Sequence, residues 1–200
     1  LMRLARESAK RGLQGLEFAA GIPGTVGGAL AINAGAYGGE IGSVVEEVKV
    51  LTPEGKRITL SGDKITFGYR YSSLQTYYIL EATLELQVHD SSILLERIKE
   101  YNLKRRNTQP LEFPNAGSVF RNPPGDSAAR LIEAAGWKGQ RVGGAQVSEK
   151  HANFIVNRGN AKAAEVLKLI KNIQEDVLAK FGVELQTEIK LYKGNKEEGT

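Results

Sequence analysis

Three polar residues have types and neighbours that could do chemistry. Arg70 lies between two tyrosines and before two serines, and its permanently charged guanidinium could bind a carboxylate or a phosphate. A surface arginine on a loop is an equally good interpretation of this residue. Ser118 lies in a Gly-Ser turn without the Gly-x-Ser-x-Gly context of a hydrolase nucleophile, so a turn hydroxyl is the simpler interpretation. Glu188 has apolar neighbours in an expected strand, which allows either a partly buried carboxylate or a solvated edge residue.

The second feature is a glycine-rich stretch, residues 21–42, with the sequence GIPGTVGGALAINAGAYGGEIG. Its small side chains leave consecutive backbone N–H groups unshielded before an alanine-rich helical turn, a geometry that can cradle an anion. The spacing matches neither GxGxxG nor GxxxxGK[ST], and a tight loop packed on its own backbone is the alternative. Asn33 and Tyr37 place a polar and an aromatic group among these small neighbours, which favours a ligand.

The composition excludes several classes of site. The 200 residues include no cysteine, which removes thiol nucleophiles, iron–sulfur ligation and cysteine zinc sites and fits a reducing cytoplasm. With two histidines we expect no metal site. No apolar run approaches the roughly 20 residues that cross a bilayer, so no membrane span is expected. The one basic cluster, residues 104–106, lacks interleaved aromatics and lies at an expected helix end, so we expect no nucleic-acid partner.

The elements that must position these residues mix helices and strands. Apolar residues at helical spacing predict helices over residues 1–12, 91–107, 126–135 and 161–181, the third with Asp126 as its N-cap and the fourth between Asn160 and Gly182. Alternation and β-branched residues predict strands over 44–52, 56–60, 78–88, 144–147, 153–157 and 184–192. Because the two kinds do not alternate regularly, the predicted class is α+β. A change of composition near residues 88–92 predicts two domains, 1–88 and 91–187.

Four motifs in order give the chain a family resemblance. They are LEFAAGIPGTVGGALAINAGAYGGEI at 16–41, GYRYSS at 68–73, NAGSVFRNP at 115–123 and LQTEI at 185–189. The first resembles the flavin-binding segment of the UDP-N-acetylenolpyruvoylglucosamine reductases, and the others match the same family in the same order. The resemblance implies an FAD-binding α+β domain, of which only the second half is present, followed by a smaller α+β substrate-binding domain. It also implies that a last strand, 188–194, returns to the first domain.

The resemblance implies an activity and a set of site residues. NADPH would reduce FAD, and UDP-N-acetylglucosamine enolpyruvate would then be reduced to UDP-N-acetylmuramate for peptidoglycan synthesis. The matching catalytic residues are Ser118, which would protonate C2 of the enolpyruvyl group, and Arg70 and Glu188, which would stabilise the charge around its carboxylate. The matching substrate-binding residues are Tyr69, Asn122, Lys138 and His151. The expected cofactor-binding residues are Gly21, Ile22, Pro23, Gly24, Thr25, Gly27, Gly28, Asn33, Gly35, Ala36 and Tyr37.

Some features depart from the family pattern. Thr108 stands where many relatives have a lysine, and the short interval between Arg70 and Arg105 indicates the shorter subgroup. Relatives have a further flavin-domain segment before the position of Leu1, so we expect this chain to be a fragment with an incomplete flavin cradle. We also expect a cytoplasmic monomer. The alternatives are another FAD-dependent oxidase of the same fold and a catalytically inert UDP-sugar-binding fragment.

Overall fold

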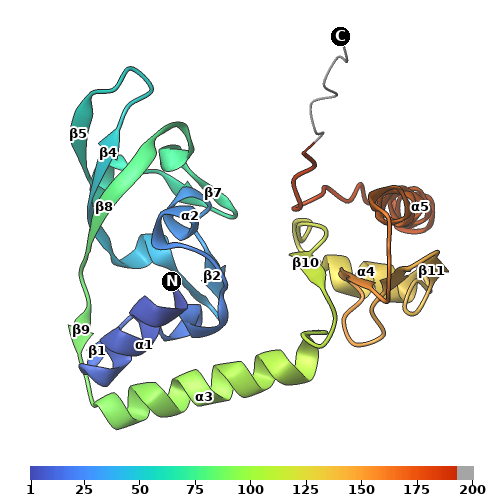
Figure 1. Cartoon of the computed structure of the whole chain (residues 1–200), viewed down its shortest axis with the longest axis horizontal. Coiled ribbons are helices and arrows are strands. Elements are labelled where there is room, and N and C mark those ends of the chain that lie inside the picture. Colours follow the sequence, from blue (N-terminus) through green and yellow to red (C-terminus); the bar gives the residue numbers. More distant parts are fainter. Residues whose placement is uncertain (193–200) are drawn as a thin grey trace. The chain divides into compact units, whose positions relative to one another are not determined.

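The structure is a computed structural model that describes residues 1–192 (Figure 1). The chain divides into two compact units, the first covering Leu1–Arg105 and the second beginning at Arg106. Each unit has its own hydrophobic core. Both mix helices with antiparallel sheet, so the predicted α+β class is confirmed.

The first unit is built from short strands and turns around a three-stranded sheet. Its sheet has the order β5-β4-β8, and three two-stranded ribbons pair β1 with β9, β2 with β3 and β6 with β7. The predicted hairpin is confirmed as β4 and β5, closed by a hydrogen bond from the Thr52 amide to the Lys56 carbonyl at 2.9 Å. The elements are α1 (Met2–Lys10), β1 (Leu13–Gln14), η1 (Glu17–Gly21), α2 (Val26–Ala31), β2 (Gly35–Ala36), β3 (Gly39–Glu40), η2 (Ile41–Val44), β4 (Val45–Leu51), β5 (Arg57–Ser61), η3 (Gly62–Lys64), β6 (Phe67–Gly68), β7 (Tyr71–Ser72), η4 (Ser73–Thr76), β8 (Tyr78–Leu84) and β9 (Gln87–Val88).

Helix α3 (Ser91–Thr108) connects the two units. Its apolar residues Leu94 and Ile98 are buried in the core of the first unit. The boundary between the two units therefore lies near the end of this helix and not near residue 91. Composition shows where helix replaces sheet, but the packing of a few apolar side chains decides which core the helix joins.

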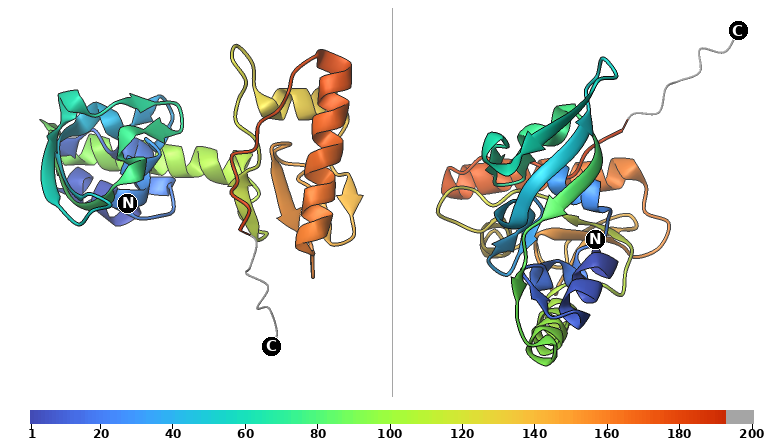
Figure 2. Two further views of the ribbon diagram at one scale, coloured as in Figure 1. Left: turned by 90° about the horizontal axis from the view of Figure 1, so that it is seen from above. Right: turned by 90° about the vertical axis from the view of Figure 1, so that its left-hand side faces the viewer.

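The second unit is a four-stranded antiparallel sheet covered by two helices. The strand order is β10-β13-β12-β11, and Figure 2 shows α5 lying along the sheet. The apolar stripes of the helices pack on the inward side chains of β12 and bury Leu131, Ile132, Leu169 and Ile173. The elements are β10 (Asn115–Ser118), α4 (Ala128–Ala134), β11 (Arg141–Val142), β12 (Ala145–Val147), β13 (Phe154–Asn157) and α5 (Ala163–Phe181). The sequence patterns missed β10 and β11, which are short.

Two predicted strands are wrong in part. The strand expected over 78–88 is two strands, because the Glu85 amide bonds to the Val44 carbonyl and β9 then pairs with β1. Among residues 184–192 the structure shows no strand and only a single bridge between Thr187 and Phe120. That bridge lies within the second unit, where buried Leu185 anchors the segment. Residues 193 and 194 of the expected returning strand lie outside the described residues.

Two predicted helix starts also need correction. Helix α4 begins after Ser127, and the Asp126 carboxylate bonds instead to the Ser127 amide and to the Arg130 guanidinium. The hydrogen bonds to Arg130 and to the Ser127 amide lower the pKa of Asp126 to about 2. Helix α5 begins at Ala163, with Lys162 before it, while Gly182 ends it in the left-handed conformation as predicted.

Candidate functional site

Residues with a left-handed backbone mark the candidate site in the first unit. Among residues 1–192, four non-glycine residues have φ near +50°, and three of them are predicted site residues, Asn33, Tyr37 and Arg70. The fourth is Asn160 in the second unit. Such residues cost free energy and persist where surrounding contacts hold them, often at functional sites. All three belong to the first unit.

The side chain of Asn33 joins the glycine-rich stretch to the hairpin that carries Arg70. It is almost completely buried, its Nδ2 donates to the Gly68 carbonyl at 3.2 Å, and its Oδ1 accepts from the Gly42 amide at 2.9 Å. A second link runs from Ser72 Oγ to the Ala31 carbonyl at 3.2 Å. Buried amide groups bonded in this way fix the two segments relative to each other.

Arg70 lies at the tip of the β6–β7 hairpin. The register pairs Gly68 with Tyr71, so Tyr69 and Arg70 form the two-residue loop. The Arg70 guanidinium carbon lies 5.3 Å from the centre of the Tyr69 ring, and this ring is largely exposed. The hairpin thus presents a cation and an aromatic face side by side, and the Asn33 contacts hold its base.

The glycines of the stretch divide between packing and open backbone. A Cβ at Gly24 or Gly38 would meet no protein atom within 4 Å, and Gly24 has a φ of +129°. The backbone at Gly24 is therefore open to close approach by a ligand. Most of the others pack within the chain: Gly21 on Arg105, Gly27 on Ile79, Gly28 on Thr25 and Gly35 on Gly39. The tight-packing interpretation therefore holds for these four glycines, and Gly24 and Gly38 have open space beside the backbone.

The remaining predicted cofactor residues lie in the same stretch. Thr25 caps α2, because its Oγ1 accepts from the Gly28 amide at 2.9 Å. Ile22 packs against the core of the first unit, Pro23 is exposed and Ala36 lies in β2.

Tyr37 connects the stretch to α3. Its ring stacks on Tyr101 with 4.5 Å between ring centres, and its hydroxyl donates to the Tyr101 carbonyl at 3.1 Å. Burial raises the pKa of Tyr37, and the positive charge of Arg105 opposes that rise. The Nζ of Lys104 lies 5.6 Å from the Tyr37 ring centre. Sequence patterns did not indicate Tyr101 as a partner of Tyr37, because helix periodicity does not show which loop a helix covers.

In the second unit the backbone brings two predicted catalytic residues together. Ser118 ends β10, and the next residue, Val119, accepts a hydrogen bond from the Glu188 amide at 2.8 Å. The Arg121 amide bonds to the Gln186 carbonyl at 2.9 Å, which extends the pairing. Ser118 and Glu188 are both partly buried. Arg70 lies in the other unit.

Asn153 is a structural residue of this site that sequence reasoning missed. Its Nδ2 donates to the Phe120 carbonyl at 2.8 Å and its Oδ1 accepts from the Phe120 amide at 2.9 Å. Its own carbonyl accepts from the Val119 amide at 2.9 Å. One buried side chain therefore fixes the segment that follows Ser118. A polar residue inside an apolar strand pattern was the available indication.

The predicted substrate-binding residues of the second unit occupy its helix α4 and the turns beside it. Asn122 Oδ1 accepts from the Ala128 amide at 3.1 Å, at the start of α4. Lys138 pairs with Glu133 at 2.7 Å. Burial and then the Lys138 charge lower the pKa of His151, whose Nδ1 accepts from the Asn153 amide at 3.2 Å. A neutral His151 next to Lys138 can offer its Nε2 hydrogen to a ligand.

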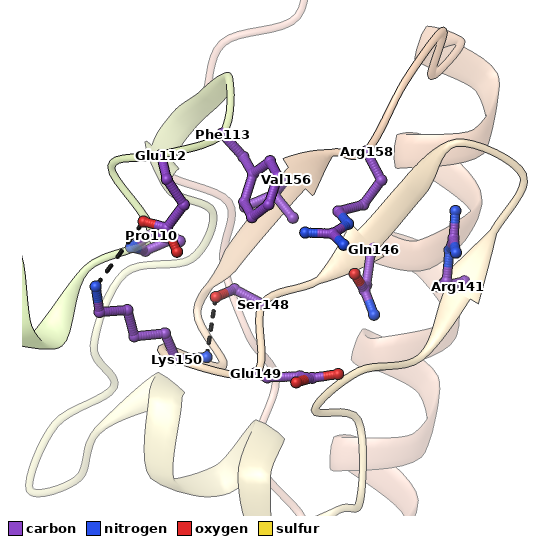
Figure 3. Close-up of a pocket in the computed structure, with 10 residues that line it drawn as sticks. All are labelled: Pro110, Glu112, Phe113, Arg141, Gln146, Ser148, Glu149, Lys150, Val156 and Arg158. Atoms are coloured by element: carbon purple, nitrogen blue, oxygen red, sulfur yellow. Dashed lines mark hydrogen bonds and ion pairs between the residues drawn. The ribbon is translucent and has the colours of Figure 1, made fainter.

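A cavity of about 280 Å³ lies elsewhere in the second unit (Figure 3). It is mainly polar, and its cations are Arg141, Lys150 and Arg158. Lys150 lies 3.8 Å from a carboxylate oxygen of Glu112, and Arg158 stacks on Phe113 at 4.1 Å. None of the lining residues belongs to the predicted set. Within residues 1–192 there is no group of three residues that could hold a metal ion, and no helix is long and apolar enough to cross a membrane.

Comparison with known proteins identifies the family. A solved structure of UDP-N-acetylenolpyruvylglucosamine reductase from Thermus caldophilus superposes with a TM-score of 0.84 and 38% identity, over 96% of this chain and 69% of that one. This chain belongs to the UDP-N-acetylenolpyruvoylglucosamine reductase family. The family model for the C-terminal domain of that reductase matches residues 109–192, and the FAD binding domain model matches residues 1–61. The resemblance found in the four motifs is confirmed.

Curated relatives show the same family and a difference in length. The reductase of Clostridium tetani is 49% identical over 191 residues, which are 94% of this chain and 62% of the relative. That of Moorella thermoacetica is 52% identical over 190 residues, 94% of this chain and 63% of the relative. The chain therefore spans about 62% of the length of the curated relatives it matches.

Proposed function

We propose that this reductase-family chain contributes to the reduction of UDP-N-acetylglucosamine enolpyruvate to UDP-N-acetylmuramate by NADPH and FAD, in peptidoglycan precursor synthesis. The observation that carries the proposal is the 0.84 TM-score to a solved reductase over 96% of the chain. The pairing that brings Ser118 beside Glu188 supports it within the second unit.

The first unit fits a flavin dinucleotide. Its glycine-rich stretch has an open backbone at Gly24, and the family model for an FAD binding domain matches this unit. We assign cofactor contacts to the predicted residues between Gly21 and Tyr37, with Asn33 fixing their position. Bound FAD would supply the hydride that this side-chain chemistry cannot.

The side chains of this chain would handle the substrate and its proton. Ser118 holds a proton on Oγ and would give it to C2 of the enolpyruvyl group, a step that a weakly acidic hydroxyl performs only beside a strongly basic carbon. Arg70 and Glu188 would stabilise the charge that develops near the carboxylate. The partial burial of Ser118 and Glu188 strengthens such electrostatic effects because water screens them less.

The UDP-sugar would be held mainly by the second unit. We assign its binding to Asn122, Lys138 and His151, with Tyr69 contributing from the first unit. Lys138 supplies a positive charge, and neutral His151 supplies a hydrogen-bond donor, as the diphosphate and sugar of the substrate require. We further propose a monomer that acts in the cytoplasm, where a chain without cysteine is at no disadvantage.

Anaerobic spectroscopy of the flavin tests the proposal. The protein is loaded with FAD, reduced with NADPH and then mixed with UDP-N-acetylglucosamine enolpyruvate. We expect the visible flavin band to disappear with NADPH and to return with the substrate. In Ser118→Ala we expect the first change to be unaffected and the second to slow by about a hundredfold or more. Ser92→Ala, at the start of α3, is the control.

Two results would count against the function. A flavin that NADPH reduces but the UDP-sugar does not reoxidise would indicate a different electron acceptor, as in an oxidase. A protein that binds the UDP-sugar and no FAD would be a binding fragment. Normal reoxidation in Ser118→Ala would remove only the role of that serine.

A further inference from the structure

We infer that Arg105 is a further ligand-binding residue, whose guanidinium binds a phosphate group of the dinucleotide held on the glycine-rich stretch. The inference rests on the proposed function, because it requires that a nucleotide lies on residues 21–37. Arg105 is the last residue of the first unit and lies near the end of α3.

The first observation is that Arg105 is partly buried without a polar partner. Its guanidinium makes no hydrogen bond or ion pair with another residue of the described 192, and its one charge interaction there is with Tyr37. Burial lowers the pKa of Arg105, and no carboxylate opposes that effect. Withdrawing a guanidinium from water is unfavourable unless an acceptor replaces the water, so a ligand oxygen is the expected partner.

The second observation is where the side chain lies. A Cβ built on Gly21 would be 3.1 Å from Arg105 Cδ and 3.4 Å from its Nη1. The guanidinium therefore lies against the end of η1, three residues before the open backbone at Gly24. Glycine at position 21 leaves the space that the arginine occupies.

Neighbouring groups hold the guanidinium in this place. Tyr37 and Tyr101 are stacked and joined by a hydrogen bond, so one wall beside Arg105 is rigid. Lys104 adds a second positive charge next to the Tyr37 ring. A guanidinium suits a phosphate, which it can bind through two parallel hydrogen bonds.

A structural role at the helix end is the alternative, since cations near a helix C-terminus complement its dipole. Arg106 shares that role and differs in being exposed, which makes it the matched control. The two roles also predict different effects of an Arg105 substitution on the affinities for FAD and riboflavin. Only the phosphate contact distinguishes FAD from riboflavin, which has the same ring system and no phosphate.

The test measures affinity and not turnover. Titration calorimetry or flavin fluorescence is used to measure binding of FAD, NADPH and riboflavin to the unaltered protein and to Arg105→Gln, Arg105→Lys and Arg106→Gln. We expect Arg105→Gln to weaken FAD binding by about ten- to a hundredfold and to leave riboflavin binding unchanged, as loss of a charged hydrogen-bonded pair predicts. Arg105→Lys should lie between, and Arg106→Gln should change binding by less than about twofold.

A second variant acts on the same contact without removing the charge. Gly21→Ala would place a methyl group against the Arg105 side chain, so it should weaken FAD binding in the same direction while the melting temperature changes little. If the loss appears with NADPH in place of FAD, the phosphate belongs to the reductant, and the inference holds for that dinucleotide. Equal losses of FAD and riboflavin, or none in Arg105→Gln, would overturn it, as would an unaltered protein that binds neither dinucleotide.

These outcomes are separate from those of the proposed function. A protein with Arg105-dependent FAD binding that fails to reduce the UDP-sugar would keep the inference and refute the function. If the protein reduces the UDP-sugar and its FAD affinity is the same in Arg105→Gln, the function holds and the inference about Arg105 is refuted.

Discussion

Asn153 gives the most direct test of how the second unit positions its predicted catalytic residues. Its amide makes two buried hydrogen bonds to the backbone of Phe120, a residue that is 1% exposed. Asn153→Ala would leave the amide and the carbonyl of Phe120 without these partners. The segment that follows Ser118 would lose two of the hydrogen bonds that hold it to the turn before β13.

The cost follows from the burial of these groups. An unsatisfied buried polar group costs about 1–3 kcal/mol, so two such groups give about 2–4 kcal/mol after some relaxation toward water. For a unit of this size, each kcal/mol lowers the melting temperature by about 4–8 °C. Asn115→Ala is the matched control, because the Asn115 side chain makes three hydrogen bonds but is exposed, so water can replace them at a cost of about 0.5–1 kcal/mol.

Tryptophan fluorescence isolates the second unit in this experiment. Trp137 is the single tryptophan of the chain, and its Nε1 donates to Asp176 within the second unit at 2.9 Å. Urea unfolding followed at this residue reports the unit that contains Asn153, and circular dichroism follows both units together. If Asn153→Ala destabilises the second unit no more than Asn115→Ala does, the two bonds to Phe120 do not fix this segment.

Three other predictions test single groups. Arg70→Gly should be more stable than Arg70→Ala by about 1 kcal/mol in urea unfolding, the reverse of the usual order, because Arg70 has a φ of +55°; equal stabilities would argue against strain there. In Gly144→Ala the new Cβ would overlap the backbone of Gly159, so unfolding followed by fluorescence should show a loss of about 2 kcal/mol or more, and an unchanged midpoint would contradict the packing. Lys138→Met should raise the pKa of His151 in an NMR titration. Folding lowers the pKa of His151, so its contribution to the free energy of unfolding is present above about pH 6.5 and is lost as the pH falls. In Lys138→Met the free energy of unfolding should therefore fall less over the same pH range.

The long periodic elements were predictable from the sequence because local patterns determine them. The hairpin of β4 and β5 has alternating side chains and turn residues, and helix α5 has an apolar stripe and a terminal glycine. The segment 184–192 also alternates, yet a strand needs a partner along its length. Here the pairing is limited to the bridge between Thr187 and Phe120 and the two hydrogen bonds that flank it, because β10 has already ended at Ser118. Pairing of this kind depends on tertiary structure that a local pattern does not contain.

The candidate site was predictable through its motifs and not through its supporting contacts. Resemblance placed Ser118 and Glu188 in the site, and the backbone pairing now shows how they come together. Asn153 and Arg105 could not be found in this way. The partners of Asn153 are backbone atoms more than 30 positions away, and those of Arg105 depend on which loop α3 covers.

The left-handed backbone at Asn33, Tyr37 and Arg70 is informative because glycine would adopt this conformation with less strain. Each costs about 1 kcal/mol or more, and the same stretch uses glycine at Gly24, where shape alone is required. A side chain retained at such a position must therefore supply something that glycine cannot. Asn33 supplies the amide that joins two segments, and Tyr37 supplies the ring that stacks on Tyr101. Those two are explained by the fold itself, so strain by itself does not identify a ligand site. Arg70 lies at the tip of a hairpin whose closure requires no guanidinium, and the role in substrate binding proposed above is consistent with a side chain at this position.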